Sequence, residues 1–105
     1  MELRVSGFDW DEANSDKCQK HGLSRREVEH VLFNAESLIV RNVKSLSGEE
    51  RHIAIGTTRA GRFSFVVFTF RTVEGELKLR PISARYMPKK EEAKYAKEIA
   101  QIQKR

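Results

Sequence analysis

The chain has 105 residues, of which 33% are charged and 39% hydrophobic, and its net charge is +5. These values are typical of one globular domain, here residues 1–105, and no apolar run approaches the ~18 residues of a membrane-spanning helix. Cys18 is the single cysteine and cannot form an internal disulfide, and the N-terminus lacks a signal-peptide pattern. We therefore expect a cytoplasmic protein without membrane contact.

Positive charge is concentrated in the second half of the chain. Residues 1–50 contain 7 Lys or Arg and 10 Asp or Glu, whereas residues 51–105 contain 13 and 5. Such an asymmetry indicates a polyanionic partner such as nucleic acid. The alternative is a lysine-rich terminal helix that only keeps the protein soluble.

Two capping signals predict two helices near the N-terminus. Asp9 or Asp11 can cap a first helix that runs to about Lys20, with Glu12 three residues after Asp9, and Gly22 can end it in the left-handed conformation.

The second signal begins at Ser24. Ser24 and Glu27 have capping-box spacing, Leu23 can pack against Val28, and the apolar stripe extends to about Phe33. We expect a second helix over this segment.

The pattern then changes to the two-residue period of strands, followed by a last helix from Pro88. The expected strands are Ser37–Asn42, Arg51–Thr57, Arg62–Arg71 and Glu76–Tyr86. The third is apolar on both faces, which predicts a central strand covered on each side, and Pro81 predicts a bulge or an edge in the fourth. The fold class is therefore α+β: two helices, a four-stranded mainly antiparallel sheet and a C-terminal helix.

Cations recur at the ends of these elements. Lys20 and His21 end the first helix, Glu50 precedes the second strand, and the arginines near strand ends or on the fourth strand are Arg51, Arg62, Arg71, Arg80 and Arg85. Arginine binds phosphate through a planar, always-charged fork, and histidine exchanges protons near neutrality. The alternatives are helix capping for Lys20 and His21, solvated or paired arginines, and a purely structural role in the core for Phe63, Phe65, Phe68 and Phe70.

Several segments together resemble a known family. They are F-D-W-D-E at 8–12, K-H-G at 20–22, the helix at 28–33, I-G-T-T at 55–58 with Gly61-Arg62, I-S-A-R at 82–85, and Glu92 with Tyr95. Their order and spacing resemble BrnT, the toxin of a type II toxin–antitoxin system. The resemblance implies a RelE-like ribonuclease fold.

The resemblance also implies an activity and partners. The activity is an endoribonuclease, ribosome-dependent or independent, that inhibits translation. The partners are RNA as substrate, a BrnA-like antitoxin with a ribbon-helix-helix domain, operator DNA bound only through that antitoxin, and an assembly of two toxins with two antitoxins. The site residues it implies are Lys20, His21, Glu50, Arg51, Arg62 and Arg85.

The expected chemistry needs neither metal nor cofactor, and the sequence has no metal-ligand spacing. The 2′-hydroxyl of RNA attacks the adjacent phosphorus, and the three implied arginines would stabilise the charge that develops. His21 or Glu50 would act as base, and His21 or Lys20 as acid. The competing hypothesis is a catalytically inactive BrnT-like module that only binds an antitoxin or RNA.

Overall fold

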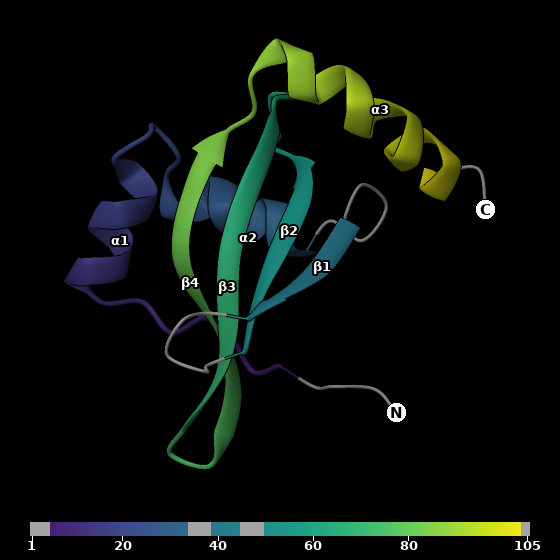
Figure 1. Ribbon diagram of the computed structural model, residues 1–105. Coiled ribbons are helices and arrows are strands. Elements are labelled where there is room, and N and C mark those ends of the chain that lie inside the picture. Colours follow the sequence, from purple (N-terminus) through teal and green to yellow (C-terminus); the bar gives the residue numbers. More distant parts are fainter. Residues whose placement is uncertain (1–4, 34–38, 45–49, 104–105) are drawn as a thin grey trace.

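The computed structural model describes residues 5–33, 39–44 and 50–103, and of residues 39–44 it describes the backbone. The elements in chain order are α1 (Glu12–Gln19), α2 (Arg25–Phe33), β1 (Ile39–Lys44), β2 (Glu50–Thr57), β3 (Phe63–Val73), β4 (Glu76–Tyr86) and α3 (Lys89–Gln103). The sheet is antiparallel with order β1-β2-β3-β4 (Figure 1). The prediction of an α+β fold with two N-terminal helices, an antiparallel sheet and a C-terminal helix is confirmed. The predicted strand start at residues 37–38 lies outside the described residues.

Helix α1 begins at Glu12 and is capped by Asp11, which confirms Asp11 of the two predicted caps. The Asp11 carboxylate accepts a hydrogen bond from the Asn14 N–H at 3.0 Å, and the Asn14 side-chain oxygen accepts one from the Asp11 N–H at 2.7 Å. The predicted pair of Asp9 and Glu12 is therefore wrong. Asp9 instead pairs with Arg80 at 3.2 Å, because its backbone is hydrogen-bonded to β4 before the helix begins.

Helix α2 has the predicted capping box. The Ser24 hydroxyl accepts from the Glu27 N–H at 3.2 Å, and the Glu27 carboxylate accepts from the Ser24 N–H at 3.1 Å. The apolar stripe of α2 covers one face of the sheet, and Figure 1 shows the helix behind the strands. The fully buried residues of this layer include Leu23, Val28, Val31, Ala54 and Val66. Burial of such an aliphatic side chain stabilises the fold by about 1.5–3 kcal/mol.

The register of β3 against β4 shifts at the predicted bulge. Val67 faces Ser83 and Phe68 faces Pro81, so Ile82 is the extra residue of β4. A proline lacks the N–H that a regular ladder requires, which explains why the interruption falls here. The segment that precedes α1 pairs with the outer edge of β4. The Asp9 N–H donates to the Leu79 carbonyl at 2.8 Å, and the Leu79 N–H donates to the Gly7 carbonyl at 3.0 Å.

Strand β3 is central, and the side that faces α2 is buried at Ser64, Val66 and Phe68. On the side away from α2, Phe65 and Val67 remain partly exposed. Helix α3 reaches only one end of this side, where the Tyr95 ring meets the Phe65 ring edge-to-face at 5.8 Å (Figure 1). The predicted cover along both sides is therefore wrong, because on this side α1 packs only against the β4 edge and α3 reaches only one end. We call the side that carries Phe65, Val67, Ser83 and Arg85 the open face.

Within residues 5–33, 39–44 and 50–103, no helix is long and apolar enough to cross a membrane.

Candidate functional site

His21 and Arg85, two of the six predicted site residues, line the same small hollow on the open face. Its volume is about 110 Å³, and Phe65, Val67, Ser83 and Ala84 complete its lining. His21 reaches it because α1 ends at Gln19 and the chain turns at Gly22, whose φ of +98° suits glycine. Arg85 reaches it because it pairs with Phe65 across β3 and β4, and paired residues share a face. We call this the His21 hollow.

The Arg85 guanidinium is held at the rim of the His21 hollow. Its central carbon lies 4.3 Å from the centre of the Phe65 ring, and one nitrogen lies 3.5 Å from the carboxylate of Glu91 in α3. Both partners of this ion pair are about half exposed, so the pair itself stabilises the fold little. The arrangement leaves a fixed positive charge beside the histidine and an aromatic ring beneath it.

Arg51, a third predicted residue, lies in a second hollow on the same face. This hollow has a volume of about 210 Å³, and the cations that line it are Lys17, Arg51, Arg71 and Arg80. We call it the Lys17 hollow. Arg80 is only 15% exposed and is held by two carboxylates, that of Asp9 at 3.2 Å and that of Asp11 at 2.7 Å.

Asp11 remains ionised in this arrangement. Its hydrogen bond from the Asn14 N–H, followed by that from Arg80, lowers the pKa of the Asp11 carboxyl below its ordinary value. The capping residue of α1 thus also fixes a guanidinium of the open face, which couples the start of the helix to the Lys17 hollow.

Arg62 lies on the other side of β4. Its guanidinium stacks on the Tyr86 ring, and the Tyr86 hydroxyl donates to the Glu27 carboxylate of α2 at 2.8 Å. Since Arg85 and Tyr86 are consecutive in a strand, their side chains point to opposite faces. The structure therefore brings Arg62 to α2 and not to Arg85.

The last two predicted residues line neither hollow. Lys20 is the exposed C-cap of α1, next to His21 in the chain. Glu50 is exposed at the start of β2, where its backbone carbonyl accepts a hydrogen bond from the Thr69 hydroxyl at 2.8 Å. Their side chains are thus peripheral to the hollows of the open face.

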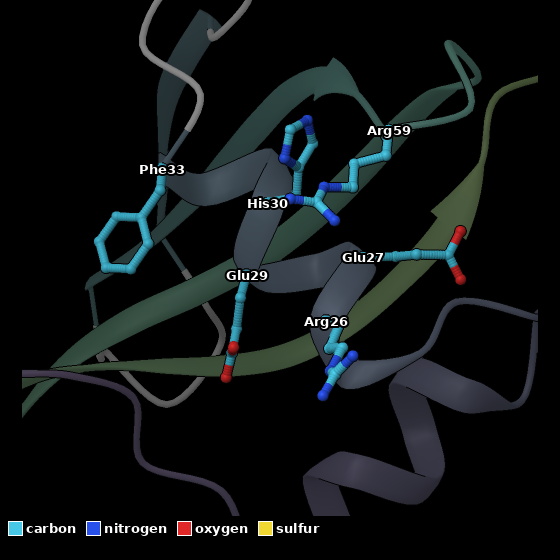
Figure 2. A pocket seen from close by; sticks show the side chains of 6 residues that line it. All are labelled: Arg26, Glu27, Glu29, His30, Phe33 and Arg59. Atoms are coloured by element: carbon cyan, nitrogen blue, oxygen red, sulfur yellow. The ribbon is translucent and has the colours of Figure 1, made fainter.

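A larger pocket of about 500 Å³ lies on the outer side of α2, and Figure 2 shows its lining residues. They are Arg26, Glu27, Glu29, His30, Phe33 and Arg59. Phe33 is 61% exposed, and Glu29 accepts a hydrogen bond from the Trp10 indole at 2.9 Å. None of the six predicted residues lines this pocket, so it is separate from the candidate site.

Lys17 and Phe65 belong to the candidate site but were not predicted for it. Lys17 lies one turn before the Lys20-His21 pair, and Phe65 has the same strand parity as Val67. The strand register places Phe65 with Arg85, and the packing of α1 against β4 places Lys17 with Arg51.

Within the described ranges, no three His, Cys, Asp or Glu side chains are grouped so that they could hold a metal ion.

A family comparison covers this region of the chain. The model of the family described as "Ribonuclease toxin, BrnT, of type II toxin-antitoxin system" matches residues 10–91. The chain belongs to the BrnT family. The match includes every residue that lines the two hollows, and the family indicates a ribonuclease toxin that has an antitoxin as partner. A search of curated proteins found none that matches this BrnT-family chain.

Proposed function

We propose that this BrnT-family chain is a metal-independent endoribonuclease toxin that cleaves RNA in the His21 hollow and thereby inhibits translation. The observation that carries the proposal is the placement of His21, Arg85 and Phe65 around one hollow on a partly exposed sheet face. This set combines a proton-transfer group, a fixed cation and an aromatic ring. These are the elements that RNA cleavage and single-stranded RNA binding need.

The proposed reaction is an internal transesterification. The 2′-oxygen of the RNA attacks the adjacent phosphorus, the bond from phosphorus to the 5′-oxygen breaks, and the products are a 2′,3′-cyclic phosphate and a 5′-hydroxyl. In this proposal His21 accepts the proton of the 2′-hydroxyl. The departing 5′-oxygen takes a proton from Lys20 or from water at the exposed mouth of the hollow. No water is consumed and no electrons are transferred.

Arg85 and Phe65 have distinct roles in this proposal. The Arg85 guanidinium stabilises the negative charge that builds up on the phosphorane oxygens. The Phe65 ring offers a surface on which an unpaired base can stack, an interaction worth about 1–3 kcal/mol per base. Arg62 acts indirectly, because its partner Tyr86 packs near Gly22, next to His21.

The test is cleavage of a labelled single-stranded RNA in the presence of EDTA. We expect His21→Ala and Arg85→Ala to lower the rate at least about 100-fold, the usual size of an acid–base or charge-stabilising contribution. Arg59→Ala is the matched control, since it removes an exposed cation on the outer side of α2. Intact RNA with the unmodified protein, or activity that EDTA abolishes, would contradict the proposal.

Growth after induced expression separates the nuclease from an inactive binding module. Growth arrest by the unmodified protein that is relieved by Arg85→Ala supports the nuclease. Unimpeded growth of cells with soluble, folded protein would instead support a module that only binds RNA or an antitoxin.

We propose a BrnA-like ribbon-helix-helix protein as the antitoxin, acting in the cytoplasm, with operator DNA bound only through it. Family membership supports this partner class. Co-expression with the BrnA-like protein should restore growth, and light scattering of the purified complex should give the mass of two toxins with two antitoxins. A complex that forms without restoring growth would contradict neutralisation by this partner.

A further inference from the structure

The Lys17 hollow has the features of a phosphate-binding site, and the reaction proposed above leaves it without a role. It is small and polar, and four of its lining side chains are cations: Lys17, Arg51, Arg71 and Arg80. The carboxylates close to these cations are already engaged, because Asp9 pairs with Arg80 and Arg71, and Asp11 pairs with Arg80. Lys17, Arg71 and Arg80 are three cations beside these two carboxylates, so this part of the hollow carries a positive charge.

The hollow is also rigidly built. The buried Asn14 amide donates to the Asp9 carbonyl at 2.9 Å and to the Pro81 carbonyl at 2.8 Å, which ties the first turn of α1 to the bulge of β4. Lys17 follows Asn14 by three residues and therefore lies on the same side of the helix. This tie holds Lys17 over the sheet while its ammonium group stays exposed to solvent.

The exposed cations of the hollow are the ones that can meet a ligand. Arg71 is 50% exposed and shares Asp9 at 3.5 Å, whereas Arg80 is 15% exposed and held by two carboxylates. Within residues 5–33, 39–44 and 50–103, no ion pair involves Lys17. Arg80 thus serves as a fixed charge, whereas the half-exposed Arg71 and the exposed Lys17 can approach an anion.

The two hollows are adjacent on the open face. Val67 faces Ser83 in the His21 hollow, and Thr69 faces Arg80 in the Lys17 hollow. Val67 and Thr69 are two residues apart on one strand, which places the pairs about 7 Å from each other on the same face. An extended nucleic-acid strand that lies along β3 therefore reaches both hollows with neighbouring phosphates.

We propose that the Lys17 hollow binds a phosphate of the RNA strand adjacent to the one that is cleaved, with Lys17 and Arg71 as its contacts. The inference rests on the proposed ribonuclease function and adds a second anchor to it. This anchor fixes the register of the RNA, so that the scissile phosphate lies beside His21 and Arg85.

The experiment measures binding of a ten-nucleotide single-stranded RNA with a 2′-O-methyl group on every ribose, which blocks the nucleophile. We expect the double variant Lys17→Ala/Arg71→Ala to bind about tenfold more weakly. The slope of the logarithm of the association constant against the logarithm of the salt concentration should fall in magnitude by about 0.7, the value for one phosphate on a single strand. Lys17→Arg/Arg71→Lys keeps both charges and should retain most of the affinity.

The matched control is Arg26→Ala/Arg59→Ala, which removes the same charge from the outer side of α2. Equal losses and equal slopes for the two double variants would overturn the phosphate site, while the ribonuclease proposal would stand. Absence of RNA binding by the unmodified protein would overturn both.

Discussion

The guanidinium of Arg62 lies 3.6 Å from the centre of the Tyr86 ring. The Tyr86 hydroxyl in turn donates to Glu27, so a loop arginine, a strand tyrosine and a helix carboxylate form one connected group. The group joins the end of β4 to α2 at a point next to Gly22, where the chain leads from His21 into the second helix. It therefore supports the candidate site without lining it.

Arg62→Ala should destabilise the protein through loss of this stacking contact. We expect the free energy of unfolding to fall by about 0.5–1 kcal/mol, the range for a cation–π contact at an exposed site. Urea denaturation followed by circular dichroism measures the change. Arg59→Ala, in the same loop, is the control and should leave stability within about 0.5 kcal/mol. Equal stability of Arg62→Ala and Arg59→Ala would show that the stacking contributes nothing.

Glu27→Gln should change how stability depends on pH. The N–H of Ser24 first, and then the Tyr86 hydroxyl, lower the pKa of Glu27 below its ordinary value of 4.5. A carboxylate whose pKa is lowered by folding stabilises the protein at pH values above its ordinary pKa. This contribution is lost as the pH falls through the pKa of the folded state. Unmodified protein should therefore exceed Glu27→Gln in stability near neutral pH, and the difference should shrink below pH 4.5. A difference that is constant with pH would contradict this role of the carboxylate.

Gly22→Ala should destabilise the protein more than Gly75→Ala. Both glycines have positive φ, +98° and +81°, so alanine is strained at each. A Cβ at Gly22 would also lie 3.3 Å from a carbon of the Tyr86 ring, whereas a Cβ at Gly75 meets nothing within 4 Å. We expect losses of roughly 1 kcal/mol at Gly75 and more at Gly22. Thermal unfolding of the two variants side by side measures the difference, and equal losses would rule out the steric contribution of Tyr86.

The thiol of Cys18 should be unreactive in the folded protein. The residue is fully buried in the core, and burial raises the pKa of its thiol to about 11. Because the thiolate is the reactive species, modification by a chromogenic disulfide reagent should occur at the rate of opening of the structure. Modification should become immediate in concentrated urea. Rapid reaction of the native protein at neutral pH would contradict the buried placement of Cys18.

The order and type of the elements could be predicted because each rests on local chemistry. Ser24 and Glu27 form their capping box from side chains three residues apart, and the interruption at Pro81 follows from a missing N–H. Asp9 and Asp11 compete for the same helix start, and what separates them is the backbone hydrogen bond from Asp9 to Leu79, a residue of β4 that is distant in sequence. No local pattern carries that information.

The candidate site was harder to predict for the same reason. Arg62 and Arg85 resemble each other in sequence as arginines near strand ends, but the register places one against Tyr86 and α2 and the other against Phe65. The chemistry of each side chain could be read from its type. Which of them share a face depends on pairing across strands, and pairing is a property of the whole sheet.

The single extra residue in β4 determines how a gain or loss of one codon in this strand would affect the protein. Arg80 and Arg85 are separated by an odd number of positions, so an unbroken strand would point them to opposite sides of the sheet. Because Ile82 is left out of the pairing by the bulge, the side chains of both arginines lie on the same side of the sheet. Loss of the Ile82 codon would therefore leave both arginines on that side, whereas gain of one codon between Ser83 and Arg85 would turn Arg85 inward without altering any functional side chain. In such proteins, a toxin could be silenced by spacing alone, with every catalytic residue still present in its sequence.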